Sequence, residues 1–191
     1  MIDKMADSGC TSVSLGIESG VQEILDRYKK KITLNHVEEA VKIMNDSSIF
    51  HGWYLIIGSG DEFDTPKYIE KNIDFMKKVK FDFLQISILT PFPGTEFYTK
   101  MVADNRLLHK NWNKYDCTHC VYQPLHMTPE QIEQYHIKAY RTLYLDRGLD
   151  IFKMAYKGFN SGFLSPTIIL ASGKHGFDFA FKKKKLFEVN H

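Results

Sequence analysis

Short apolar runs alternate with helical patterns over much of this chain, and this alternation constrains the fold more than any other feature. The runs at residues 12–17, 50–58 and 81–89 have the length and composition of buried strands. The segments 33–45 and 65–79 between them repeat apolar residues at helical spacing. Strands that alternate with helices lie parallel and are connected by right-handed crossovers. The sequence therefore predicts an α/β fold built on a parallel sheet.

Local signals mark where two of these helices begin. Thr65 stands directly before Pro66, which is the arrangement of a cap residue followed by proline at the first helical position. Either Thr33 or Asn35 caps the earlier helix, and Asn35 with Glu38 three residues later fits a capping box. Both helices are expected to bury one apolar face against the sheet.

The first residues have the pattern of a helix that is already ending. Residues 1–8 carry apolar side chains on one side, and Gly9 supplies a stop. A domain seldom begins with a helix that leads straight into a buried strand, so we expect this chain to be the later part of a longer protein. The alternative is a small complete domain that starts with a short helix.

Composition and charge exclude several classes of protein. The chain is 43% hydrophobic and 25% charged, which argues against disorder, and its net charge of +2 gives no whole-chain sign of nucleic-acid binding. No apolar run approaches the ~18 residues of a membrane span. The lysine run at 182–185 is interpreted as a solvated tail rather than a membrane-surface or nucleic-acid contact. Three cysteines and no secretory signal predict a reducing, cytoplasmic compartment.

The residues that follow the predicted strands are the candidates for chemistry. Gly16 would let a ligand approach the backbone, and Glu18 could accept hydrogen bonds from ribose hydroxyls or an amino group. Ser19 could cap the next helix. Gly58 ends the second apolar run, and Pro91 lies in a turn stiffened by two prolines. All are expected at the carboxyl ends of strands, where β/α barrels keep their active sites.

Each of these features also has a simpler interpretation. A glutamate is favourable at a helix start whether or not it binds anything, and Ser19 could serve only as a cap. The stretch Gly58-Ser59-Gly60 could be a plain turn, and it lacks the G-x4-G-K-[ST] pattern of a phosphate loop. Spacing alone does not decide between these interpretations.

The residue patterns of these segments resemble those of one enzyme family. S-L-G-I-E-S at residues 14–19, the glycine-rich stretch with Glu62 and Thr65 after the second strand, and T-P-F-P-G-T at residues 90–95 are together similar to the radical S-adenosylmethionine (radical SAM) enzymes. The first segment is especially similar to their cobalamin-binding branch. One position departs from the pattern, because Gly60 stands where that family usually has proline. This loop therefore departs from the family's pattern at the adenine-side contact.

The resemblance implies a fold and a set of cofactors. It implies the second half of a partial (β/α)6, TIM-like barrel over residues 1–105, a loop and helix that close the core over 106–147, and a mostly helical accessory extension over 148–191. It implies contacts to S-adenosylmethionine (SAM) from Glu18 first, then Ser19, with Gly16, Gly58 and Pro91 around the cofactor. It also implies a [4Fe-4S] cluster, cobalamin, and a small-molecule substrate.

A missing motif limits what this chain is expected to do alone. The C-x3-C-x2-C motif that holds the cluster in radical SAM enzymes is absent from the sequence. We therefore expect a fragment whose cluster ligands and cobalamin domain lie in the missing N-terminal part of the same protein. The chain alone is expected to be inactive, and no catalytic residue is assigned.

Two readings without catalysis stand beside this one. The chain could be a half-barrel interaction module, or a small zinc-binding domain through Cys117 and Cys120, with His119 between them. A C-x2-C pair supplies only two of about four zinc ligands, and no second pair follows at finger spacing.

Overall fold

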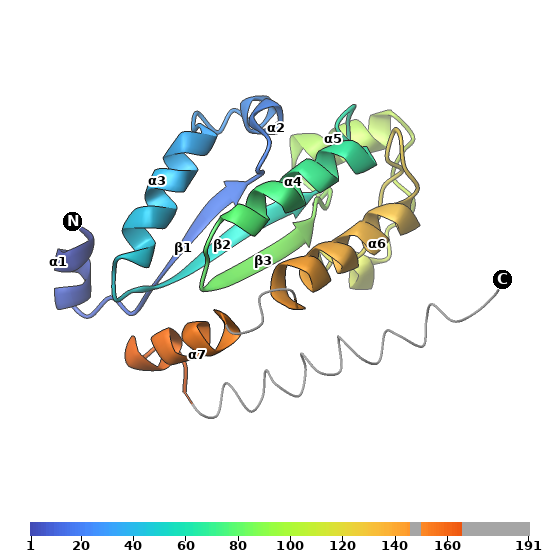
Figure 1. Ribbon diagram of the computed structural model, residues 1–191. Helices are drawn as coiled ribbons and strands as arrows, with labels where there is room; N and C mark the ends of the chain where they lie inside the picture. Colours follow the sequence, from blue (N-terminus) through green and yellow to red (C-terminus); the bar gives the residue numbers. More distant parts are fainter. Residues whose placement is uncertain (146–149, 166–191) are drawn as a thin grey trace.

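The computed structural model of the protein describes residues 1–145 and 150–165. A parallel three-stranded sheet lies at its centre, in the order β1 (Ser12–Glu18), β2 (Phe50–Ile57) and β3 (Phe83–Ile88) (Figure 1). The prediction of an α/β fold with a parallel sheet is confirmed. Since the strands are parallel, their carboxyl ends lie together at one end of the sheet.

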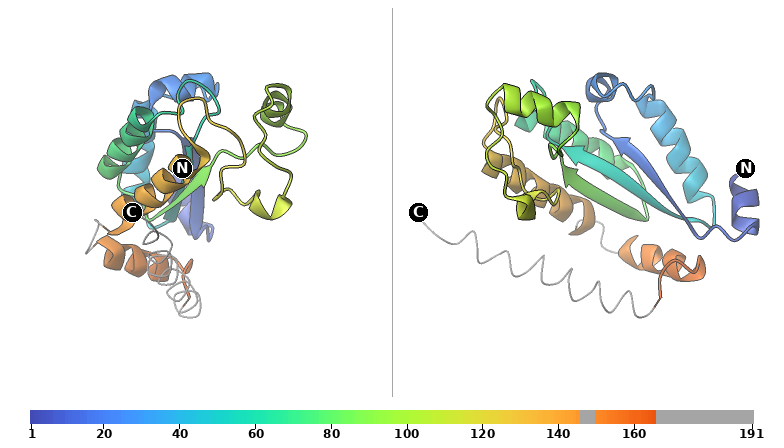
Figure 2. Two further views of the ribbon diagram at one scale, coloured as in Figure 1. Left: turned by 90° about the vertical axis from the view of Figure 1, so that its right-hand side faces the viewer. Right: turned by 180° about the vertical axis from the view of Figure 1, so that it is seen from behind.

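Helices connect and surround the strands. Their bounds are α1 (Ile2–Asp7), α2 (Gln22–Arg27), α3 (Leu34–Asn45), α4 (Pro66–Lys78), α5 (Glu96–Ala103), the short 3-10 helix η1 (Trp112–Lys114), α6 (Pro129–Tyr140), its π-helical continuation η2 (Arg141–Leu145), and α7 (Asp150–Asn160). Figure 1 shows α3 and α4 on one face of the sheet, and Figure 2 shows η1 on the opposite side. No helix in the described residues is both long and apolar enough to cross a bilayer.

The helix starts follow local chemistry. Thr65 caps α4 by accepting a hydrogen bond from the Tyr68 N–H, with Pro66 at the first helical position, as predicted. Thr33 caps α3, and the capping box is completed by His36, whose ring accepts from the Thr33 N–H at 3.2 Å. The predicted box of Asn35 and Glu38 is therefore wrong, because the helix begins two residues earlier than that pair requires.

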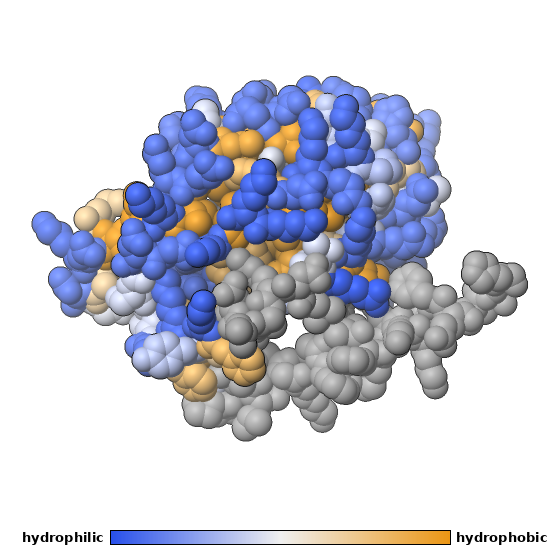
Figure 3. All heavy atoms as spheres, in the orientation of Figure 1, coloured by the Kyte–Doolittle hydropathy of each residue, from blue (hydrophilic) through white to orange (hydrophobic). Residues whose placement is uncertain are grey.

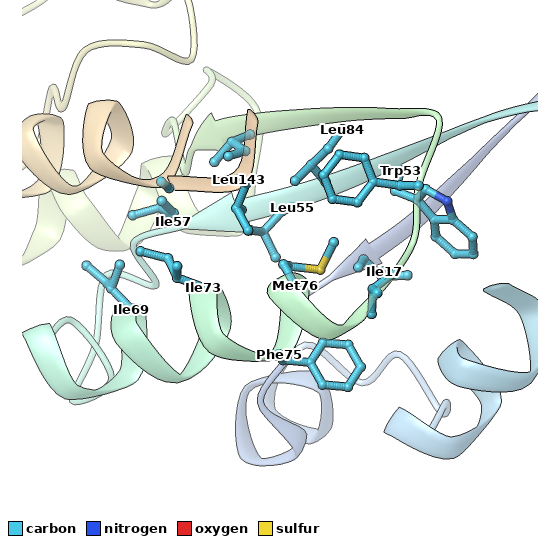
Figure 4. Packing of buried hydrophobic residues seen from close by; sticks show 14 of the residues in the cluster. Ile17, Trp53, Leu55, Ile57, Ile69, Ile73, Phe75, Met76, Leu84 and Leu143 are labelled. Atoms are coloured by element: carbon cyan, nitrogen blue, oxygen red, sulfur yellow. The ribbon is translucent and has the colours of Figure 1, made fainter. Parts of the chain in front are cut away.

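The hydrophobic core lies between the sheet and the layer formed by α3 and α4. Alternate residues of β2, among them Trp53, Leu55 and Ile57, point into this layer and are almost fully buried (Figure 4). Ile73 and Met76 of α4 meet them from the other side. The outward surfaces of these helices are mostly hydrophilic, as Figure 3 shows. Each helix thus buries one face, as its periodicity predicts.

The opposite face of the sheet is more polar and more open. Ser14 and Gln85 are exposed on this face, and the exposed fractions of Tyr54 and Phe83 are 39% and 45%. A nearly all-apolar run such as 50–58 predicts a strand that is buried on both faces, and this prediction is wrong at Tyr54. Its alternate residues meet the core on one side only, and within the described residues no helix layer covers the other side at Tyr54.

The outer edge of β3 is closed by side chains rather than by another strand. The Tyr144 hydroxyl accepts from the Leu84 N–H at 2.7 Å and donates to the Leu84 carbonyl at 2.6 Å. The Tyr140 hydroxyl bonds the N–H and carbonyl of Ile86 in the same way, at 2.9 and 3.1 Å. The N–H of Ile88 donates to the Cys117 carbonyl at 2.7 Å. The outward-facing N–H groups of Leu84, Ile86 and Ile88 thus all donate to an acceptor outside the sheet.

The described part of the C-terminal region packs at the amino ends of the strands. Lys157 of α7 lies 2.9 Å from the Asp82 carboxylate, which also accepts from the His51 N–H at 3.0 Å. The Phe163 ring stacks on Phe50 with centroids 4.5 Å apart. The lysine run at 182–185 lies outside the described residues. Helix α7 therefore sits at the end of the sheet opposite the candidate chemistry (Figure 1).

Candidate functional site

Strand β1 ends in a strained turn centred on Glu18. The φ angle of Glu18 is 65°, in a region that residues other than glycine rarely adopt. The Ser19 N–H donates to the Ile17 carbonyl at 2.8 Å, so the chain reverses over three residues in the less common form of γ-turn. The pairing register with β2 also shifts between Gly16 and Glu18. Strain of this kind at a strand end is typical of a ligand site.

The turn places a carboxylate and an ammonium group above the strand end. Lys30 Nζ lies 3.1 Å from Glu18 Oε1, and both side chains are partly exposed. A Cβ atom at position 16 would lie 2.5 Å from the same carboxylate oxygen. Gly16 therefore leaves room for Glu18 to fold back over it, and a larger residue would displace this flexible carboxylate. Lys30 stands in a lysine run in the sequence, but no spacing rule indicated that it would meet Glu18.

Ser19, predicted as a second cofactor contact, is fully buried. Its hydroxyl donates to Asn72 Oδ1 at 2.8 Å and accepts from the Val21 N–H at 3.1 Å. The Gly20 N–H donates to the same Asn72 oxygen at 2.6 Å. Ser19 thus fixes the loop between β1 and α2 to helix α4. Its contact with a cofactor stays a prediction, and within the described residues its hydroxyl is already hydrogen-bonded.

Strand β2 leads into Gly58, where the backbone needs glycine. Its φ angle is 84°, and an added Cβ would lie 2.5 Å from the Tyr122 hydroxyl oxygen. The Tyr28 hydroxyl donates to the Gly58 carbonyl at 3.2 Å. Burial raises the pKa of Tyr28 and of Tyr122, with nearby carboxylates adding to the shift, so both phenols stay protonated and act as donors.

Asp64 holds the rest of this loop, and sequence reasoning missed it. Its buried carboxylate accepts from the Ser59 N–H at 2.5 Å, the Gly60 N–H at 3.0 Å and the Tyr122 hydroxyl at 3.4 Å. Burial raises the pKa of Asp64, although the bonds from Ser59 and Gly60 oppose that shift. The loop is therefore closed by hydrogen bonds, without the proline that the radical SAM pattern has at position 60.

Strand β3 leads into a turn with little freedom. Pro91 is buried, and the Phe92 N–H reaches back to the Thr90 carbonyl at 3.0 Å. The Phe92 carbonyl accepts from the Thr95 hydroxyl at 2.7 Å, and Thr95 caps α5. Since β2 lies between β1 and β3, this turn stands two strands away from Glu18. The structure thus brings Gly16 and Glu18 together, with Gly58 on the next strand and Pro91 on the one after.

The predicted zinc alternative finds no geometric support. Within residues 1–145 and 150–165, no three histidine, cysteine or acidic side chains lie close enough to hold a metal ion. The Cys120 thiol is buried, which raises its pKa to about 12 and keeps it from acting as a thiolate. Cys117 has a φ angle of 62° and supplies its carbonyl to β3. His119 pairs with Asp116 instead, at 2.9 Å.

Asp116 should have an unusually acidic side chain. Burial alone would raise its pKa, but the Thr118 N–H, the His119 ring and the Thr118 hydroxyl together lower it to about 2. A depressed folded-state pKa means that this carboxylate stabilises the fold above about pH 3.8 and that the contribution disappears as pH falls toward 2. We expect nuclear magnetic resonance titration of the Asp116 carboxyl to give a midpoint near 2. In Asp116→Asn, the free energy of unfolding should depend less on pH between about 3.8 and 2. A midpoint near 4 would contradict the geometry.

Comparison with known proteins finds several enzymes that are similar in sequence to this chain. It is 38% identical over 141 residues to an uncharacterized methyltransferase of Pyrococcus horikoshii, covering 74% of this chain and 30% of that protein. It is 33% identical over 138 residues to bacteriochlorophyllide d C-12(1)-methyltransferase of Chlorobaculum tepidum, covering 72% and 29%. It is 23% identical over 157 residues to anaerobic magnesium-protoporphyrin IX monomethyl ester cyclase of Cereibacter sphaeroides, covering 82% and 25%.

These similarities concern only part of each relative. The chain spans about 30% of the length of the first two proteins that it matches. No family model matches the chain. By sequence, the chain is thus homologous to a portion of methyltransferases and of a magnesium-protoporphyrin IX monomethyl ester cyclase.

Proposed function

We propose that this chain is the second half of a partial (β/α)6 barrel of a radical SAM enzyme of the cobalamin-binding branch, and that it contributes the SAM-binding strand ends. One observation carries the proposal: Glu18 and Lys30 meet above Gly16 in a strained turn at the carboxyl end of a parallel strand. Methyltransferase relatives imply use of SAM and support the same ligand.

The charges at this strand end complement the charges of SAM. The Glu18 carboxylate can accept hydrogen bonds from the ribose hydroxyls or from the ammonium group of the methionine part. Lys30 can donate to the methionine carboxylate. A ligand that carries both charges can replace the Glu18–Lys30 contact by two contacts of its own. The stiff ends of β2 and β3 would form the neighbouring walls of this site.

The described residues do not fit an iron–sulfur cluster. Such a cluster needs several thiolates, whereas Cys120 is buried with a raised pKa and no group of metal-binding side chains forms in the described part of the chain. We therefore propose that the [4Fe-4S] cluster, and cobalamin where it is used, are held by residues outside this chain. What this chain supplies is binding and orientation of SAM and of a small-molecule substrate, and exclusion of water around them.

The natural partner of this chain is the N-terminal part of the same protein. Within the described residues no strand pairs with the outer edge of β1, and Tyr54 and Phe83 are exposed on the open face of the sheet. A further set of strands joined to β1 would cover both features. The same features favour a second candidate function, a half-barrel module that acts only by binding another chain. We place the complete enzyme in the cytoplasm.

Binding of SAM to the purified chain tests the proposal. Glu18→Ala should raise the dissociation constant for SAM, measured by calorimetry, by about 10-fold or more, because hydrogen bonds to charged groups contribute ~1.5–3 kcal/mol. Glu23→Ala is the matched control, since that glutamate is exposed on α2 and lies 3.8 Å from Lys71. Equal affinity of Glu18→Ala and the wild type would contradict the proposal, as would an equal loss in Glu23→Ala.

A further inference from the structure

An aromatic patch lies beside the end of β3, formed by Phe92, Trp112 and Tyr115. The Tyr115 ring is the buried centre, with the Phe92 centroid 6.4 Å away and the Trp112 centroid 4.8 Å away. The two outer rings remain exposed, by 43% for Phe92 and 54% for Trp112. The patch therefore presents flat apolar surface to solvent at the same end of the sheet as Glu18.

The patch is held by a rigid backbone. Phe92 stands between two prolines and bonds Thr90 through its N–H and Thr95 through its carbonyl. Asn111 caps η1, and the Tyr115 hydroxyl donates to the His109 carbonyl at 2.8 Å. Burial raises the pKa of Tyr115, so this phenol keeps its proton and its bond. Aromatic side chains fixed in this way lose little entropy when a ligand stacks on them.

Two lysines next to the patch narrow the chemical class of ligand that it could bind. Lys110 and Lys114 flank Trp112 in the sequence and are exposed, and neither forms an ion pair within residues 1–145 and 150–165. Flat apolar rings beside unpaired ammonium groups complement a conjugated ring that carries carboxylates. Single-stranded nucleic acid also stacks on aromatic residues, but it needs a basic groove that follows its backbone, and two lysines do not form one.

We propose that this aromatic patch binds the ring of the substrate, and that the substrate is a flat conjugated molecule with acidic substituents. The inference rests on the proposed function, because it places the ring on the side of the sheet where SAM would lie. Figure 2 shows η1 on the side of the sheet away from α3 and α4, the side to which Tyr54 and Gln85 are exposed. A ring on the patch would thus lie next to the open face of the sheet.

Titration with coproporphyrin, a water-soluble flat ring with several carboxylates, tests the inference through the anisotropy of the ring's own fluorescence. Trp112→Ala and Phe92→Ala should each raise the dissociation constant about 10-fold, the usual loss for one stacked ring. Tyr156→Ala is the matched control, because that ring is 69% exposed on α7 at the other end of the sheet. An unchanged constant in Trp112→Ala, or an equal loss in Tyr156→Ala, would overturn the inference.

Two further readouts separate the remaining explanations. The chain has two tryptophans, of which Trp53 is buried and Trp112 exposed, so a bound ring should protect the exposed one from acrylamide quenching. Light scattering reports association, and a dimer that Trp112→Ala abolishes would show instead that the patch joins two copies. SAM is titrated into the same preparations. Ring binding without SAM binding contradicts only the proposed function, and SAM binding without ring binding contradicts only this inference.

Discussion

Replacing Tyr140 and Tyr144 together by phenylalanine should lower the free energy of unfolding by about 2–6 kcal/mol, since the two hydroxyls make four hydrogen bonds to the edge of β3 and each bond contributes ~0.5–1.5 kcal/mol. The rings themselves remain, so packing should change little. Urea denaturation measures the stability loss. Hydrogen exchange should locate it, with faster exchange at the amides of Leu84 and Ile86.

Tyr135→Phe is the control for this prediction. Tyr135 stands on the same helix, and its partly buried ring packs against the core beneath the Lys138 ammonium group. Because the ring is kept, that variant should stay within about 0.5 kcal/mol of the wild type. If the double variant were equally stable, or if exchange at Leu84 and Ile86 stayed slow, side-chain capping of the β3 edge would be refuted.

Removing the Asp64 carboxylate should destabilise the protein by about 2–4 kcal/mol at neutral pH, because Asp64→Ala leaves the N–H groups of Ser59 and Gly60 and the Tyr122 hydroxyl without this acceptor in a buried loop. The pH dependence has a defined sign. Since burial raises the folded-state pKa of Asp64, its stabilising contribution is complete below about pH 4 and falls as pH rises through that raised pKa.

Chemical denaturation of the wild type and of Asp64→Ala, from acid to neutral pH, measures the free energy of unfolding of each protein. The difference between wild type and Asp64→Ala should be larger in acid than at neutral pH. Asp74→Ala, at an exposed position of α4 where the carboxylate pairs with Lys77, should have little effect at either pH. A loss no greater than that of Asp74→Ala would show that the Gly58–Asp64 loop does not depend on this carboxylate.

Features that depend on neighbours in sequence could be predicted. Thr65 with Pro66 marks a helix start because a cap bonds an amide only three residues away. The parallel arrangement follows from strands that alternate with helices, and the glycines at strand ends follow from backbone geometry. Even so, Thr33 and Asn35 were both possible caps for α3, and only the structure shows that His36 completes the capping box with Thr33.

Features that depend on distant contacts could not be predicted in this way. Tyr122 reaches Asp64 across 58 positions, and Tyr144 reaches Leu84 across 60. In the sequence Tyr140 and Tyr144 follow a helix start at Thr128 and Pro129, and nothing local shows that their hydroxyls face strand amides. Lys30 reaches Glu18 because the chain bends at Lys29 and Lys31, which have positive φ angles of 54° and 56°.

The sheet has two unlike margins, and this limits how copies of the chain can associate. On the β3 side the outward amides of Leu84, Ile86 and Ile88 are all bonded, whereas within residues 1–145 and 150–165 no strand is paired beyond β1. If two copies paired through their β1 strands, both unpaired sheet edges would be used in that contact. Only the β3 edges, which are capped by side chains, would remain at the outside of the pair. Strand-to-strand growth would then stop at a pair, so this geometry protects the three-stranded sheet from forming filaments.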